Sequence, residues 1–333
     1  MTIIDAHSHL ASMRITPVSF IEGAARNHQV MLESAGIHLE LSVLIDRFSE
    51  HMQDDQGDNY VSLCREAGVK AAVMLCPDFS YILKDCPVSA EENLTYHRDM
   101  ARHHGGFLNL FAGVDPRWGS DGVRLFEIAV RDWGFGGLKL YPPCGYSPSD
   151  PMLDPFYEIC AAHKLPVVIH IGPTSPVLEF AFARPFLVDS AAARFPGVNF
   201  ILAHGATCFT EECMMLASCR PNVYVDVSGF QAGRNAFSVT GPGIFSWGLS
   251  HKLIFGTDWP VLQSQMSYGS CIEYFTSVDG PMGELSVAQQ RLVMSNNASR
   301  ILGTKLSTDA GSKRWQGLPS VAEHVDLKRE AFL

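Results

Sequence analysis

Eight short apolar runs, each followed by a segment with the apolar spacing of a helix, constrain the fold of this 333-residue chain most strongly. Strands that are apolar along almost their whole length, each with a helix after it, are typical of a parallel sheet covered by helices. Eight such units close into a (β/α)8 TIM barrel. The runs begin at Thr2 and then span residues 71–76, 108–114, 137–141, 166–171, 198–204, 223–228 and 252–257.

A doubly wound open sheet is the structural alternative for the same alternation of strand and helix. Against it, no GxGxxG motif follows any of the apolar runs. In addition, polar residues able to perform chemistry recur at the ends of several well-separated runs, and only a closed barrel brings all those ends to one face. We therefore predict one barrel domain over residues 1–303.

Two segments depart from the alternation. Residues 11–69 form an excursion too long for a turn, with helix-like spacing over 20–32 and 60–67, and predict a helical cap insertion followed by the first barrel helix. Residues 304–333 lose the strand rhythm and predict a C-terminal extension. We expect that extension to end in a helix and to pack on the barrel or on the partner subunit of a homodimer.

Charge and cysteine content limit the classes of partner. A formal net charge of −10 without a long basic run argues against binding to nucleic acid or to an anionic membrane surface, and favours a small-molecule substrate. No apolar stretch approaches the ~20 residues that cross a bilayer. The nine cysteines include no CxxC pair, and no secretory signal precedes the first strand, which predicts reduced thiols in a cytoplasmic protein.

The first apolar run ends in Asp5-Ala6-His7-Ser8-His9. Residues two apart on a strand project to the same side, so His7 and His9 can direct both imidazoles at one point. Two imidazoles suit a transition metal and leave positions open for further ligands and water. A hydrogen-bonded histidine pair without a metal is the alternative for this motif taken alone.

Three later runs also end in polar residues, namely His170, His204 and Asp258. In a closed parallel barrel the carboxyl ends of all strands lie on one face, so these three residues converge with His7 and His9. A single histidine after a strand is more often structural. Four histidines and an aspartate at such ends instead predict a metal-dependent active site.

The pattern resembles the amidohydrolase superfamily, in particular amidohydrolase family 2. That family includes metal-dependent hydrolases and decarboxylases such as aminocarboxymuconate-semialdehyde decarboxylase. The resemblance covers nearly all of residues 1–303. It rests on Asp5-Ala6-His7-Ser8-His9, His170, His204, Gly256-Thr257-Asp258-Trp259-Pro260 and Asn297-Ala298-Ser299-Arg300-Ile301-Leu302.

The resemblance implies that His7, His9, His170 and Asp258 hold one divalent metal. Zinc is the expected ion, with manganese, iron, cobalt and nickel as alternatives, and His204 stands beside the metal as a catalytic acid or base. The chemistry of the donors agrees, because three neutral imidazoles and a carboxylate leave an open position where water is activated near neutral pH. Asp258 can also accept the proton of that water.

Lys139 and several weaker candidates complete the predicted site. Some amidohydrolases carry a carboxylated lysine on the fourth strand that bridges two metals, so Lys139 is a candidate for such a bridge. We expect a single metal, which leaves a cationic Lys139 that binds a substrate group as the other interpretation. Tyr141 and Trp259 are candidate walls of a substrate pocket, and Arg184 is a candidate partner for a substrate carboxylate.

Our leading hypothesis is a metal-dependent hydrolase that cleaves an amide, ester or lactone bond of a small carboxylated molecule through metal-activated water. A non-oxidative decarboxylase of the same family would use the same ligands. Several decarboxylases of this family have glutamate at the first ligand position, where this chain has His7, and this difference disfavours that alternative. A barrel that binds a metabolite without turnover is the third hypothesis.

Overall fold

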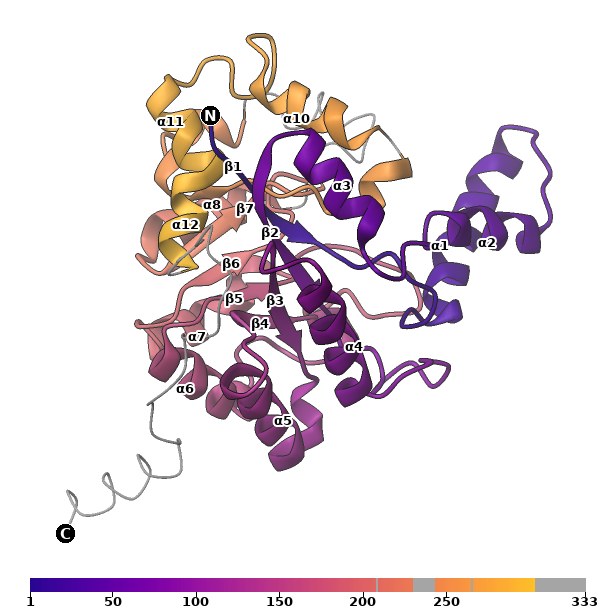
Figure 1. The fold of residues 1–333 in the computed structure, drawn as a ribbon, viewed down its shortest axis with the longest axis horizontal. Helices are drawn as coiled ribbons and strands as arrows, with labels where there is room; N and C mark the ends of the chain where they lie inside the picture. Colours follow the sequence, from indigo (N-terminus) through magenta and orange to yellow (C-terminus); the bar gives the residue numbers. More distant parts are fainter. Residues whose placement is uncertain (208, 230–242, 265, 303–333) are drawn as a thin grey trace.

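The computed structural model describes residues 1–207, 209–229, 243–264 and 266–302. Their eight parallel strands pair in sequence order, and β1 also lies beside β8, where Ala6 N donates to Phe255 O at 3.0 Å (Figure 1). The predicted (β/α)8 barrel is therefore confirmed. The strands are β1 (Ile3–Ser8), β2 (Val69–Cys76), β3 (Leu108–Gly113), β4 (Gly137–Leu140), β5 (Val167–Ile169), β6 (Phe200–Leu202), β7 (Val223–Asp226) and β8 (Leu253–Ile254).

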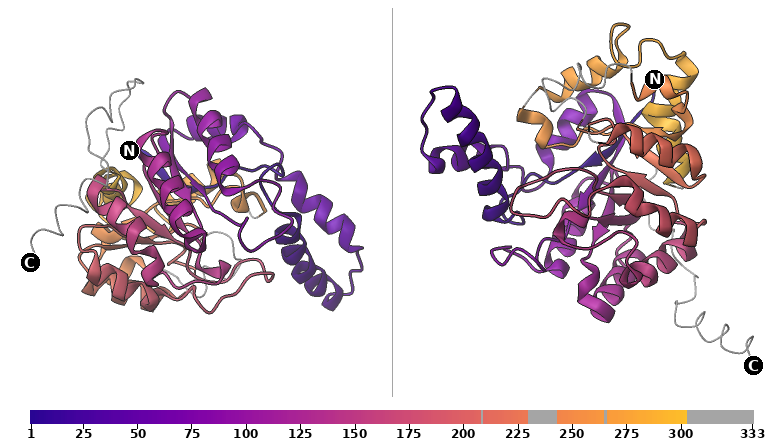
Figure 2. Two further views of the ribbon diagram at one scale, coloured as in Figure 1. Left: turned by 90° about the horizontal axis from the view of Figure 1, so that it is seen from below. Right: turned by 180° about the vertical axis from the view of Figure 1, so that it is seen from behind.

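Helices surround the strands on the outside of the barrel (Figures 1 and 2). Helix α4 shows why such segments begin where they do, because Ser89 and Glu92 form a reciprocal capping box at its first turn. The predicted helix over residues 287–302 is interrupted by a π-helical segment, Leu292–Asn296. The helices are α3 (Asp58–Glu66), α4 (Ala90–His103), α5 (Gly119–Arg131), α6 (Asp154–His163), α7 (Asp189–Arg194), α8 (Thr210–Cys219), α10 (Tyr268–Thr276), α11 (Val287–Arg291) and α12 (Asn297–Ile301).

The strands bury apolar side chains on both faces, which explains their almost continuous apolar sequence. Outward-facing residues such as Leu138 and Leu140 pack in a large cluster with the helices. Because side chains alternate along a strand, Lys139 between these leucines points into the barrel. The inward-facing apolar cluster contains Ile4, Val73, Leu75, Phe111, Val168, Ile201, Tyr224 and Ile254.

A buried carboxylate joins the first and last strands of the barrel. The Oδ2 atom of Asp5 accepts hydrogen bonds from Tyr60 Oη at 2.8 Å, Tyr268 Oη at 2.9 Å and Thr257 Oγ1 at 2.7 Å. These partners come from α3, from α10 and from the segment after β8. Asp5 therefore ties the seam between β8 and β1 to two of the surrounding helices, and its side chain does not face the metal ligands.

The excursion after β1 contains α1 (Val18–Ser34) and α2 (Leu41–Glu50), which form a hairpin beside the mouth of the barrel, and then α3 (Figures 1 and 2). Helix α2 was not predicted from the sequence, and only Leu44 among its ten residues is buried. None of the described helices combines the length and apolarity that crossing a membrane requires. The predicted C-terminal extension, residues 304–333, lies outside the described residues.

Candidate metal centre

Hydrogen bonds to the Nδ1 atoms fix the imidazoles of His7 and His9. His7 Nδ1 lies 2.8 Å from Asp226 Oδ2, and His9 Nδ1 lies 3.0 Å from the carbonyl oxygen of Leu75. Because a carboxylate and a carbonyl oxygen only accept, each Nδ1 carries the hydrogen and each Nε2 keeps a free lone pair. Partners of this kind orient histidine ligands in metal sites.

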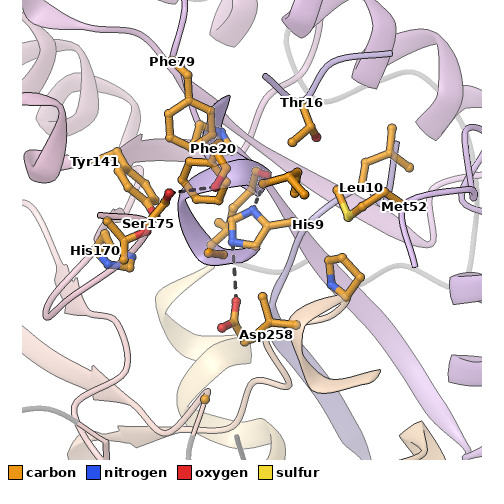
Figure 3. Close-up of a pocket in the computed structure, with 18 of the residues that line it drawn as sticks. His9, Leu10, Thr16, Phe20, Met52, Phe79, Tyr141, His170, Ser175 and Asp258 are labelled. Atoms are coloured by element: carbon orange, nitrogen blue, oxygen red, sulfur yellow. Dashed lines mark hydrogen bonds and ion pairs between the residues drawn. The ribbon is translucent and has the colours of Figure 1, made fainter. Parts of the chain in front are cut away.

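Asp258 completes a triangle of donor atoms with these histidines. The two Nε2 atoms of His7 and His9 are 3.3 Å apart, and Asp258 Oδ1 lies 3.5 Å from the first and 3.6 Å from the second. Nitrogen and oxygen donors about 2.1 Å from one metal lie about 3–3.6 Å from each other. The three atoms therefore have the spacing of ligands to a single ion. Figure 3 shows His9 and Asp258 facing each other.

His170 is the predicted fourth ligand. Its Nε2 is buried and has no hydrogen-bond partner within the described ranges of the chain. The ring stacks on Tyr141, with centroids 4.3 Å apart, and its centroid lies 4.8 Å from that of His204. A buried nitrogen lone pair without a donor is unfavourable in the protein alone and suits a metal ligand. The predicted donor set of three imidazoles and a carboxylate thus fits a divalent cation.

Burial sets the charge of these groups. It lowers the pKa values of His7, His9 and His170 well below the ordinary histidine value, and the positive charge of Lys139 acts in the same direction. The imidazoles are therefore neutral at neutral pH, as metal ligands must be. Burial also raises the pKa of Asp258, an effect that Lys139 opposes and that a bound cation would oppose further.

His204 lies beside this set in an unusual backbone conformation. Its φ angle is +60° and that of Asp258 is +57°, in the left-handed region that is uncommon for residues other than glycine. Asp226 Oδ1 accepts from His204 N at 3.1 Å, and burial lowers the pKa of His204 to about 3. His7, His204 and Asp258 each offer a ligand atom within 4.8 Å of the others, so His204 is also a possible ligand on distance alone.

A relay through Ser228 fixes the tautomer of His204. The Ser228 hydroxyl donates to Asp226 Oδ1, and Ser228 Oγ lies 2.9 Å from His204 Nδ1. Since the single hydroxyl hydrogen is directed at the carboxylate, His204 Nδ1 must donate to Ser228 Oγ. His204 Nε2 is then the basic nitrogen, which suits the predicted role in proton transfer. Ser228 was not predicted as a site residue, because a serine at the end of a strand is common.

Lys139 is buried, with 1% of its surface exposed, and its Nζ has no hydrogen-bond partner among the residues that the structure describes. Burial lowers its pKa, while Asp226 and Asp258 act in the opposite direction. Nζ lies 5.7 Å from the ring centroid of Tyr141. Lys139 is not among the described residues that line the pocket. Its position below the ligands suits an electrostatic role.

Replacing Lys139 with methionine tests the number of metals. If one metal binds, Lys139→Met keeps about one equivalent per chain, because the ligands come from other strands. Elemental analysis of wild-type and variant protein after metal-supplemented expression checks this result. A fall from two equivalents to one or none would instead establish a carboxylated lysine bridge.

A cavity of about 430 Å³ opens above the candidate ligands (Figure 3). His9, His170, His204 and Asp258 form its polar end. Three aromatic rings follow one another along its wall, with centroid distances of 4.9 Å between Phe20 and Phe79 and 5.0 Å between Phe79 and Tyr141. The α1 and α2 helices contribute Phe20, Ile21, Ala24 and Phe48, so the excursion after β1 forms part of the pocket.

Two predicted contributors to the pocket lie elsewhere. Trp259 is almost fully buried against Tyr60, with centroids 5.9 Å apart, and does not line the cavity. Arg184 forms an exposed ion pair with Glu212 and also lies outside the cavity. Sequence position after a strand places a residue in the right loop but does not determine which way its side chain points. Tyr141, in contrast, does line the pocket.

Several solved structures share the fold of this chain. The chain is similar to an uncharacterised TIM-barrel protein from Bordetella bronchiseptica, at 16% identity and TM-score 0.64, over 91% of this chain and 99% of that one. It is similar to 5-carboxyvanillate decarboxylase from Novosphingobium aromaticivorans, solved with manganese and a nitrobenzoic acid, at 13% identity and TM-score 0.60, over 91% and 96% of the chains.

A third similar structure is 2,6-dihydroxybenzoate decarboxylase from Rhizobium, at 13% identity and TM-score 0.61, over 91% and 99% of the two chains. At these identities the likeness shows a shared fold. A comparison with curated proteins gives no match. The family model described as Amidohydrolase matches residues 4–304, almost the whole described chain. As the sequence motifs indicated, this protein belongs to amidohydrolase family 2.

Proposed function

We propose that this chain is a metal-dependent hydrolase that cleaves an ester, lactone or amide bond of a small molecule with an apolar, flat body. The triangle of His7 Nε2, His9 Nε2 and Asp258 Oδ1, at 3.3–3.6 Å, carries this proposal, because it lies at the polar end of an aromatic-walled cavity. A divalent cation held by these atoms and by His170 would polarise the substrate carbonyl and activate water.

The residues of the chain divide the remaining tasks. Asp258, whose pKa is raised by burial, is a more basic carboxylate than an exposed aspartate and can take the proton of the attacking water. His204 Nε2, whose lone pair is free because the relay through Ser228 to Asp226 places the hydrogen on Nδ1, can accept a proton and pass it to the leaving group. Phe20, Phe79 and Tyr141 exclude water and hold the flat part of the substrate.

The expected carboxylate on the substrate needs revision for a hydrolase. Among the described lining residues there is no arginine or lysine, so a carboxylate remote from the metal would have no cationic partner there. The proposed hydrolase therefore acts on a substrate whose body is uncharged.

Non-oxidative decarboxylation is the second candidate. The absence of arginine and lysine from the described lining of the pocket favours it. A carboxylate could be held in this pocket at the metal end, which is where a decarboxylase must bind it. Two of the similar structures are named as decarboxylases of substituted aromatic acids, and one of them was solved with manganese. Protonation of the ring carbon in place of the lost carbon dioxide would then fall to Asp258 or His204.

Assays of two matched panels separate these reactions. Protein loaded with zinc or manganese is incubated with aryl esters, lactones and anilides, and separately with hydroxylated aryl carboxylates, while acid release and carbon dioxide release are recorded. Acid release from the first panel without carbon dioxide from the second is expected. Carbon dioxide release alone would replace the first proposal with the second, and no product from either panel would contradict both.

A further inference from the structure

Two polar side chains on one face of α4 line the pocket and take no part in the proposed chemistry. Asn93 and His97 are four residues apart, one helical turn, so they lie on the same side of the helix. Both are more than nine-tenths buried, with 7% and 1% of their surfaces exposed. Polar groups this deep normally have all their hydrogen bonds made.

The side-chain oxygen of Asn93 has no donor. Its Nδ2 atom donates to the carbonyl oxygen of Pro77 at 3.0 Å, which fixes the orientation of the amide. Oδ1 is then the buried remaining atom, and it has no partner within the described part of the chain. Such an acceptor is unfavourable in the free protein and becomes satisfied when a ligand brings a donor.

His97 offers a second acceptor. Its Nδ1 lies 2.8 Å from the backbone carbonyl oxygen of Asn93, which can only accept, so Nδ1 carries the hydrogen. Burial lowers the pKa of His97 to about 4, so the ring is neutral at neutral pH. Nε2 is therefore a bare acceptor, and no described residue donates to it.

Other hydroxyl groups of the pocket are already engaged. Thr16 Oγ1 donates to Ser12 O at 2.8 Å, Ser175 Oγ donates to Phe20 O at 2.7 Å, and the hydroxyl groups of Tyr141 and Thr174 bond to each other. Asn93 Oδ1 differs from these hydroxyl oxygens because it makes no hydrogen bond with any described residue, so it gains most from a donor on the ligand.

The barrel order places this face beside His9, which follows β1 and bonds to Leu75 of β2, and across the barrel from His204. Asn93 is bonded to Pro77, which directly follows β2, whereas His204 follows β6. In an eight-stranded barrel β2 and β6 lie on opposite sides. A substrate held at the candidate ligands can also meet α4, because His9, Asn93 and His97 line the same cavity.

We propose that Asn93 Oδ1 and His97 Nε2 form an accepting subsite for a hydroxyl or amino group on the body of the substrate. The substrate class is then an aromatic or similarly flat molecule that carries a carboxyl-type group and, apart from it, a hydrogen-bond donor. The placement of the carboxyl-type group rests on the proposed function, whereas the requirement for a donor rests on α4.

Binding of matched ligand series tests the subsite without turnover. The probes are benzoate and 2-naphthoate together with their hydroxy, amino and methoxy derivatives at the ring positions farthest from the carboxylate. Calorimetric titration into zinc-loaded protein should show that the best hydroxy or amino compound binds at least about tenfold tighter than its methoxy counterpart, because an ether offers no donor to the two acceptors.

Two variants test whether Asn93 causes the preference for hydroxy over methoxy ligands. Asn93→Leu removes the acceptor and should reduce the ratio of hydroxy to methoxy affinity to about one. Thr16→Val, which removes a pocket hydroxyl that is already bonded within the chain, should leave the ratio unchanged. If Asn93→Leu does not fold, as judged by circular dichroism, His97→Leu takes its place and should lower the same ratio.

Equal affinities of hydroxy and methoxy compounds in both the benzoate and the 2-naphthoate series would overturn the subsite. A preference that survives in Asn93→Leu would also overturn it, and so would a failure of every probe to bind. These outcomes are distinct from failure of the proposed function. A donor preference in a protein without hydrolase or decarboxylase activity keeps the subsite and rejects the function, and turnover without donor preference does the reverse.

Discussion

His9→Ala is expected to lose stoichiometric metal and almost all activity. Removing the hydrogen-bonded partner of a ligand typically weakens metal affinity by about 10–100-fold, and removing the ligand itself should exceed about 100-fold. His9 is the better choice than His7, because its side chain is 20% exposed whereas that of His7 is fully buried and bonded to Asp226. Elemental analysis and competition with a chelating dye measure the effect.

A matched control comes from the same pocket. His51 also lines the cavity but is exposed and lies outside the donor triangle, so His51→Ala should keep wild-type metal content. If His9→Ala retained its metal at wild-type affinity, the ligand set would instead be His7, His204 and Asp258, whose ligand atoms also lie within 4.8 Å of one another.

Substituting His204 with asparagine is expected to keep the metal and lower kcat by roughly 10²–10⁴-fold, the usual contribution of a positioned acid or base. Asparagine is chosen over alanine because the φ angle of +60° is tolerated by asparagine and strained for alanine. The decisive readout is a fall in kcat in a variant that keeps its metal.

Steady-state kinetics on whichever panel gives product, together with metal content, provides this readout. Loss of metal in His204→Asn equal to that in His9→Ala would show that His204 is a ligand. Unchanged kcat with full metal content would remove His204 from proton transfer and leave Asp258 as the remaining candidate.

The fold was predictable because each strand and most helices of the barrel have a recognisable local sequence pattern. Each strand is an apolar run, and apolar spacing with flanking residues predicts helices over 154–163 and 210–219, which are the bounds of α6 and α8 in the structure. The convergence of His7, His170, His204 and Asp258 followed from one geometric rule about parallel strand ends. Neither step needed knowledge of how any side chain packs.

The walls of the pocket could not be predicted in that way. Trp259 and Arg184 follow strands as Tyr141 does, yet only Tyr141 faces the cavity, because side-chain direction in a loop depends on tertiary contacts. Asn93 and His97 had no signal, since their four-residue spacing is that of any helix face. The left-handed backbone at His204 and Asp258 was equally hidden, because neither residue is glycine.

The contact between β1 and β8, which Asp5 stabilises, has a consequence for folding during synthesis. His7 and Asp258, which lie 3.5 Å apart through Nε2 and Oδ1, are separated by 251 positions in the sequence. Contacts of such long range form late, after local units have folded. A ribosome-bound chain that lacks its last strand therefore cannot assemble the ligand triangle. Loading of the proposed metal would then be a post-translational event, and truncation before residue 258 would yield a product that added metal cannot rescue.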